Sequence, residues 1–166
     1  MPLLWILGIV ALQRVVELWY AQRNTRALLA RGAVEIAPRQ HAYFVALHAA
    51  WLLAMLAAIP WNTRPNWSLV ACFFVLQALR VWIIASLGPY WTTRILTLTG
   101  VPLVRKGPYR FVRHPNYVVV TLEIATLPIA FGAWTLAAIF TALNAMLLAW
   151  RIYAEDRALA ERRALR

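Results

Sequence analysis

Residues 106–117 read KGPYRFVRHPNY, and this stretch stands between two long apolar segments of the chain. It combines cations with two prolines, a histidine and two tyrosines. A new apolar run begins at its end, at Tyr117, and an acidic residue follows inside that run, at Glu123. Charged side chains so close to apolar runs indicate a polar functional site at the surface of a membrane.

The composition is that of a membrane protein. The 166 residues are 63% hydrophobic and 14% charged, with a mean hydropathy of +0.62, whereas a soluble domain carries about 25% charged residues. The hydrophobic residues fall in long runs, which is typical of spanning helices. We expect a single membrane domain over residues 1–166, with a three-helix part at 1–88 and a site-bearing part at 89–166.

Five apolar segments predict an all-α integral membrane protein with five transmembrane helices. Most of them approach the roughly 20 residues that a spanning helix needs. The fourth is shorter and contains Pro128, and Gly132 follows it at a tight turn, so we expect a C-terminal helical hairpin. The segments are Leu3–Tyr20, His41–Ile59, Trp67–Leu87, Tyr117–Phe131 and Trp134–Trp150.

The basic residues are distributed unevenly among the connections. Fourteen of the 17 Lys and Arg residues fall in residues 21–40, residues 88–116 and the tail after Trp150, whereas only Arg64 lies in the other connections. The positive-inside rule then predicts an outer N-terminus and a cytoplasmic C-terminus, in the inner membrane of a bacterium or archaeon. The net charge of +11 fits attraction to membrane lipids, and we expect no nucleic-acid partner because the cations do not gather on one face.

Four charged residues lie within the predicted spans, where unpaired charges are costly. Arg14 and Glu17 are three residues apart and can pair on one helical face. Arg80 needs an acidic partner or a polar cavity, and both structural pairing and substrate contact are open. Glu123 lies nearly two turns into the fourth helix, where it can hold a cationic ligand or a donor from the preceding loop.

The loop ahead of the fourth helix has backbone features of a sharp turn and a helix start. Gly107 permits the turn, and Pro115 suits the first turn of a helix because its missing N–H costs nothing there. Asn116 can cap the helix locally. His114 is held extended by the following proline, and either a structural or a catalytic role is open to it.

Other side chains offer contacts for a nucleoside. Tyr109 and Tyr117 can stack on a flat base such as adenine, although tyrosine also anchors helices at the interface. Arg151 and Glu155 share one helical face, either as a solvated charged surface or as a site in which Arg151 binds a carboxylate and Glu155 faces an ammonium or ribose hydroxyls. The single cysteine, Cys72, excludes a disulfide and a zinc cluster, and we expect no metal.

Three motifs belong together: GPY at 107–109, VRHPNY at 112–117 with Glu123 after it, and Arg151 with Glu155-Asp156. They resemble the isoprenylcysteine carboxyl methyltransferase (ICMT) family and, more widely, the membrane phospholipid methyltransferases. The resemblance extends from about Trp91 onward and implies an enzyme that uses S-adenosylmethionine. The residues that it assigns to cofactor binding are Lys106, Gly107, Tyr109, Val112, Arg113, His114, Pro115, Tyr117, Glu123 and Glu155.

The implied reaction is O-methylation of a carboxylate or hydroxyl on a lipophilic acceptor, a small molecule or a prenylated or lipid substrate, that enters from the bilayer. The resemblance makes Arg151 and Glu155 the catalytic residues. Arg151 would position the acceptor or the cofactor carboxylate, and Glu155 or His114 would act as a base only for a hydroxyl acceptor, because a carboxylate needs none.

The N-terminal half, with Arg14-x-x-Glu17, His41 and His48, looks more like the bacterial members that methylate phenolic or pyrone lipids, so the acceptor stays open. Two alternatives remain. One is N-methylation of a phosphatidylethanolamine-type lipid, and the other, in a different class, is a small non-catalytic membrane transporter or scaffold.

Overall fold

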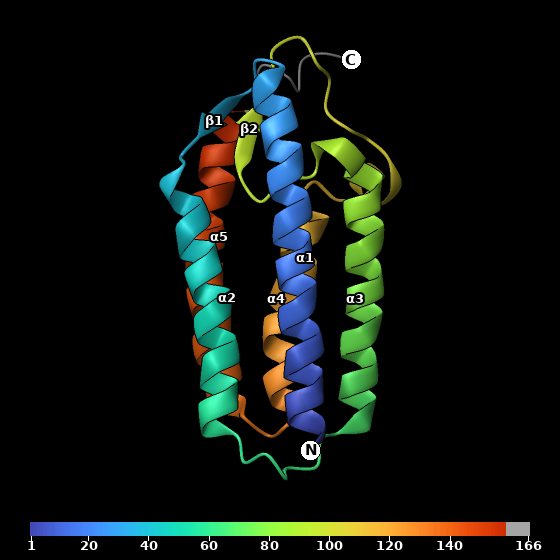
Figure 1. Ribbon diagram of the computed structural model, residues 1–166, viewed down its shortest axis with the longest axis vertical. Helices are drawn as coiled ribbons and strands as arrows, with labels where there is room; N and C mark the ends of the chain where they lie inside the picture. Colours follow the sequence, from blue (N-terminus) through green and yellow to red (C-terminus); the bar gives the residue numbers. More distant parts are fainter. Residues whose placement is uncertain (159–166) are drawn as a thin grey trace.

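The computed structural model describes residues 1–158, which form a bundle of five helices running along one long axis (Figure 1). The helices are α1 (Pro2–Ala30), α2 (Arg39–Ala58), α3 (Trp67–Leu87), α4 (Pro115–Ala130) and α5 (Trp134–Ala158). The connections contain the strands β1 (Val34–Ile36) and β2 (Ile95–Thr97) and the 3-10 turns η1 (Gly88–Tyr90) and η2 (Gly107–Arg110). The basic residues Arg162, Arg163 and Arg166 of the predicted cytoplasmic tail lie outside the described residues.

Helix α4 is the inner helix of the bundle, and it packs against both α3 and α5. Its residues Ile124 and Leu127 are completely buried, together with Trp51 of α2 and Phe73 of α3. The other helices carry large apolar side chains on their exposed faces, among them Trp5, Leu12, Leu53, Val75, Trp134 and Met146, and α4 itself exposes Val118 and Leu122. An apolar core inside an apolar outer surface is the arrangement expected of a bundle surrounded by lipid.

Four helices of the described chain, α1, α2, α3 and α5, are long and apolar enough to cross a membrane. Helix α4 is apolar but has only 16 residues, or about 24 Å at 1.5 Å per residue, against about 30 Å of hydrocarbon. The predicted helical body of the fold is therefore confirmed, with four candidate spans. A fifth span through α4 stays a prediction.

The predicted helical hairpin between α4 and α5 is present. Pro128 lies in the last turn of α4, and Gly132 follows with φ +74°, a left-handed conformation that glycine adopts without strain. The N–H of Gly132 donates to Ile129 and that of Ala133 to Pro128, each at 2.9 Å. These bonds close the turn within three residues.

Helix α1 is longer than the apolar segment that predicted it. It continues past Tyr20 to Ala30, because alanine, leucine and arginine favour helix even where hydrophobicity ends. Asn24 in this extension donates from Nδ2 to the carbonyls of Gly88 (3.1 Å) and Trp91 (2.9 Å). The extension thereby binds the chain that leaves α3.

A small sheet, which the sequence analysis did not predict, joins two connections. Strands β1 and β2 are antiparallel, with Val34 opposite Thr97, and Arg94 Nη1 contacts the Glu35 carboxylate at 2.8 Å. Three-residue strands have too few residues to produce a recognisable alternation of polar and apolar positions. The sheet holds the α1–α2 connection against residues 91–98.

The two ends of the bundle differ in charge. The N-terminus and the α2–α3 and α4–α5 turns lie at one end, whereas β1, β2 and the α3–α4 connection lie at the other (Figure 1). The connections predicted to face the cytoplasm are thus at the same end. Which membrane surface each end faces remains a prediction from the charge distribution.

Single-cysteine labelling tests this orientation. In a Cys72→Ser background, we expect a membrane-impermeant maleimide to label Asn62→Cys in intact spheroplasts but Arg26→Cys only after lysis. Both residues are exposed, and they belong to the α2–α3 turn and to the last turns of α1, which lie at opposite ends of the bundle. Labelling of Arg26→Cys alone in intact spheroplasts would reverse the assigned orientation.

Candidate functional site

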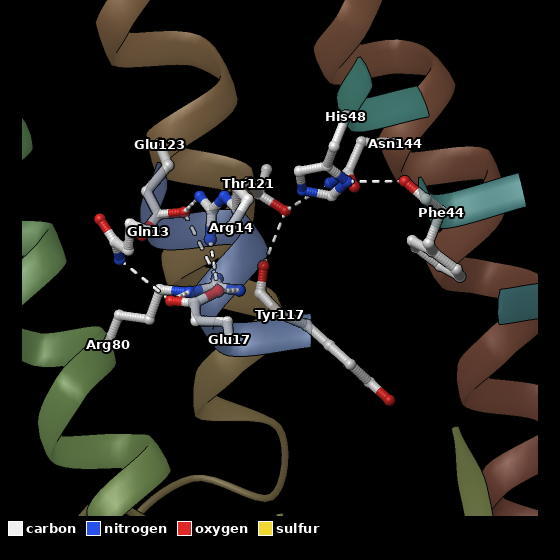
Figure 2. A network of polar contacts seen from close by, with 10 residues as sticks. All are labelled: Gln13, Arg14, Glu17, Phe44, His48, Arg80, Tyr117, Thr121, Glu123 and Asn144. Carbon is white, nitrogen blue, oxygen red and sulfur yellow. Dashed lines mark hydrogen bonds and ion pairs between the residues drawn. The ribbon is translucent and has the colours of Figure 1, made fainter. Parts of the chain in front are cut away.

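A cluster of four charged residues from three helices lies in the bundle interior (Figure 2). Arg80 of α3 binds Glu17 of α1 through two bonds, Nε to Oε1 at 2.7 Å and Nη2 to Oε2 at 2.8 Å. Arg14 contacts Glu17 at 3.1 Å and Glu123 of α4 at 2.5 Å. The expected pairing of Arg14 with Glu17 is confirmed, and Arg80 has the acidic partner it needs.

The cluster is neutral as a whole, with two guanidinium groups and two carboxylates. Glu123 is completely buried, and Glu17 and Arg80 are less than a tenth exposed. Charges withdrawn from water are tolerated only when they are paired in this way. The cluster therefore fixes α1, α3 and α4 relative to one another.

A cavity of about 560 Å³ lies directly beside this cluster, and Arg80 is in its wall. The cavity occupies the end of the bundle that carries β1 and β2, and its volume is typical of small-molecule sites. Its walls come from residues 91–98 and 103–105, from the loop before α4 and from α2, α4 and α5. Segments far apart in the sequence thus enclose one space.

Tyr117 is the junction between the loop and α5. Its hydroxyl donates to the Glu155 carboxylate and accepts from Arg151 Nε at 2.9 Å. The His114 ring stacks on Tyr117 with 5.0 Å between centroids and 8° between planes, and His114 Nδ1 lies 3.9 Å from Glu155 Oε1. The two parts of the chain that the sequence analysis assigned to one site are therefore in direct contact.

Tyr109 of η2 is a second hydroxyl in the cavity wall. Burial raises the pKa of Tyr109 well above its usual value, and the nearby Glu155 carboxylate raises this pKa further. Its ring packs against the small apolar group Leu76, Ile83 and Val119. Tyr109 is therefore a fixed, protonated hydrogen-bond donor.

Asn116 carries a buried acceptor in the same wall. Its Oδ1 atom has no hydrogen-bond partner among residues 1–158. The predicted local capping by Asn116 is wrong, because His114 occupies the capping position of α4 and Asn116 lies within the first turn. An unpaired buried acceptor suits a ligand that brings its own donor.

The predicted site residues divide into two groups. Six line the cavity, namely Tyr109, Arg113, His114, Tyr117, Arg151 and Glu155. Five are not in its lining: Lys106, Gly107, Val112, Pro115 and Glu123. Lys106 and Val112 are exposed and Pro115 is buried, whereas Glu123 pairs with Arg14 and Arg80.

Gly107 supports the loop from outside the cavity. It has φ +53°, and a Cβ atom there would lie 2.2 Å from Ser86 Oγ of α3. The close approach packs η2 onto α3 and so sets the position of Tyr109.

Several cavity residues were not predicted from the sequence. Phe44 and His48 come from α2, and the segment 91–98 supplies a wall of its own. His48 is a polar residue inside a long apolar segment, and this position could have indicated that α2 contributes to the cavity. The contribution of residues 91–98 depends on the small sheet, for which the sequence carries no clear signal.

Comparison with known proteins places the chain in a family. Residues 69–161 match the isoprenylcysteine carboxyl methyltransferase (ICMT) family, which is more than half of the chain. The protein belongs to this family. The match includes the loop, α4 and the described part of α5 that carries Arg151 and Glu155.

Two relatives cover most of the chain. The uncharacterized protein YpbQ of Bacillus subtilis is 38% identical over 162 residues, which is 95% of this chain and 96% of YpbQ. An uncharacterized protein of Haemophilus influenzae is 26% identical over 144 residues, or 83% of each chain. No solved structure matches the chain.

Removing one carboxylate from the buried cluster tests its structural role. Glu123→Gln leaves two guanidinium groups with the single carboxylate of Glu17, and an uncompensated buried charge costs about 3–5 kcal/mol. We expect the unfolding midpoint in detergent to fall by roughly 10 °C. Arg14→Met in the same variant should recover part of the loss.

Glu35→Gln is the matched control, because its pair with Arg94 is partly exposed and worth at most about 1 kcal/mol. Equal destabilisation by Glu123→Gln and Glu35→Gln would contradict the assigned role of the buried cluster.

Proposed function

We propose that this protein is an S-adenosylmethionine-dependent membrane methyltransferase that O-methylates a carboxylate or hydroxyl of a lipophilic acceptor. Membership of the ICMT family supports the reaction class. The observation that carries the proposal is the contact of Tyr117 with both Glu155 and Arg151 at the wall of one cavity.

The donor set of the cavity fits S-adenosylmethionine. Asn116 Oδ1 is an acceptor without a partner in the described chain, which suits the amino group of adenine or a ribose hydroxyl. Glu155 supplies a carboxylate for ribose hydroxyls or for the ammonium group. The stacked rings of His114 and Tyr117 offer an aromatic surface beside the base.

Other predicted cofactor residues take supporting parts in this proposal. Arg113 lines the cavity and can pair with the cofactor carboxylate. Gly107, Pro115 and Glu123 position the loop and α4 without touching the cofactor. Lys106 and Val112 flank the site on its exposed side.

The catalytic contribution of the chain is alignment. S-adenosylmethionine supplies an electrophilic methyl group, and in-line transfer requires the acceptor oxygen to be held close to it, which can contribute several kcal/mol. Arg151 is buried, and its guanidinium contacts both Tyr117 and the ring face of Phe44. A guanidinium fixed on two sides can position an oxygen acceptor.

The acceptor and the cofactor reach the site by different routes in this proposal. The exposed apolar faces of the outer helices favour a lipid-soluble acceptor that arrives from the bilayer. The polar cofactor enters from the cytoplasm, on the side predicted by the basic connections. The protein then acts in the inner membrane with its site facing the cytoplasm.

Calorimetry with S-adenosylhomocysteine in detergent tests the cofactor site. We expect binding by the wild type and at least about tenfold weaker binding by Glu155→Gln, since a hydrogen bond to a charged group contributes about 1.5–3 kcal/mol. Arg64→Gln, at the opposite end of the bundle, should bind as the wild type does. A protein that binds no S-adenosylhomocysteine would be a transporter or scaffold rather than a methyltransferase.

Methyl transfer to membrane lipid extracts tests the role of Arg151. With labelled S-adenosylmethionine, we expect Arg151→Gln to lose about 100-fold or more of the rate, because acceptor alignment is lost, whereas Arg64→Gln keeps it. Full activity of Arg151→Gln would refute the assigned role. Label found on phosphatidylethanolamine nitrogen would favour the N-methylating alternative.

A further inference from the structure

His48 is a polar residue on the cavity side of α2 that lies outside the predicted site. It lines the cavity together with Phe44, one helical turn before it. The rest of α2 around it is strongly apolar. A polar side chain is costly on an apolar membrane helix, so an imidazole that faces a cavity indicates a functional role.

The hydrogen bond of His48 defines its tautomer. Its Nδ1 atom lies 2.8 Å from the carbonyl oxygen of Phe44 (Figure 2). A carbonyl oxygen only accepts, so Nδ1 carries the proton and the neutral ring has its lone pair on Nε2. Within residues 1–158, Nε2 has no hydrogen-bond partner.

Phe44 locates His48 relative to the proposed methyl donor. The guanidinium carbon of Arg151 lies 5.3 Å from the centre of the Phe44 ring. His48 follows Phe44 by four residues, so it lies about one turn, or roughly 6 Å, further along α2. The imidazole thus lies about one turn further along α2 than the Phe44 ring that contacts Arg151.

Helices α4 and α5 contribute apolar side chains to the cavity wall about one turn from Tyr117 and Arg151. Val120, three residues beyond Tyr117, and Leu148, three residues before Arg151, both line the cavity there. A wall of apolar side chains with a few polar groups suits the head of a lipophilic molecule whose tail lies among helices.

We propose that His48 Nε2 is the base for methyl transfer to a hydroxyl acceptor, a lipophilic phenol or enol. This inference rests on the proposed function. The acceptor proton passes to Nε2, and the oxygen forms its bond to the methyl carbon. The methyl–sulfur bond breaks with its electron pair staying on sulfur, which leaves neutral S-adenosylhomocysteine, and the imidazolium then releases its proton to water.

A carboxylate acceptor fits this layer less well. It arrives ionised and has no proton to give, so an imidazole lone pair would face negative charge. Arg80 is the member of the buried cluster that reaches the cavity wall, and its three nitrogens already bind the carboxylates of Glu17 and Glu123. The geometry favours a neutral hydroxyl at His48.

Methyl acceptors of different acidity distinguish a catalytic base at His48 from a residue with only a structural role. The probes are a lipophilic 4-alkylphenol, protonated at neutral pH, and its 2,6-dinitro derivative, a nitrophenol that is ionised at neutral pH. We expect His48→Gln to slow kcat with the alkylphenol by about 100-fold and with the nitrophenol by less than about tenfold. His41→Gln, on the same helix but outside the cavity lining, is the matched control and should keep both rates.

Two binding and spectroscopic measurements complete the test. S-adenosylhomocysteine affinity should stay within about twofold in His48→Gln, since the variant leaves the cofactor contacts intact. Nitrogen-15 NMR of the protein, which has three histidines, should show an Nδ1-protonated ring whose signals disappear in His48→Gln.

Equal losses of kcat with both phenols, no loss with the alkylphenol, or an Nε2-protonated ring would each overturn the role of His48. A wild type that binds S-adenosylhomocysteine and methylates a lipophilic carboxylate but no hydroxyl would overturn this inference alone. A wild type that neither binds S-adenosylhomocysteine nor transfers methyl groups would overturn the proposed function and this inference with it.

Discussion

The rest of the structure depends on the pairing of four charges inside an apolar bundle. Arg14, Glu17, Arg80 and Glu123 come from three helices, and none of them can be withdrawn from water without its partners. Because the partners must meet, α1, α3 and α4 have little freedom to shift. The same pairing places Arg80 in the wall of the cavity, so the constraint that stabilises the bundle also shapes its site.

The cavity has two chemically distinct layers. Toward the loop it has Tyr109, Asn116, Tyr117 and Glu155, which offer donors and acceptors for a polar nucleoside. One turn further along α2 the wall contains the imidazole of His48 together with apolar side chains such as Val120 and Leu148, and Arg80 of the buried cluster is also in the wall. A methyltransferase that transfers a methyl group from a water-soluble donor to a lipid-soluble acceptor needs a polar and an apolar environment in one cavity, with the reacting atoms at their boundary.

The helices and the hairpin turn could be predicted from hydrophobic runs and from residues that are close together in the sequence. Helix α3 has the predicted bounds, and the hairpin turn at Gly132 follows from residues next to one another. The contact of Tyr117 with Glu155 followed from family motifs 38 residues apart. Three features could not be predicted because each depends on a contact between residues far apart in the sequence. They are the extension of α1 that binds Trp91, the short sheet, and the position of Glu123 between two arginines rather than in the cavity lining.

Hydrogen exchange with and without S-adenosylhomocysteine tests the central claim most directly, because it reports on both halves of the site at once. The account predicts that the ligand slows exchange in residues 104–117 and in residues 151–157 together, while the turn at residues 59–66, at the opposite end of the bundle, exchanges at an unchanged rate. Protection of only one of the two segments, or of neither, would contradict a single nucleoside site formed by the loop and α5.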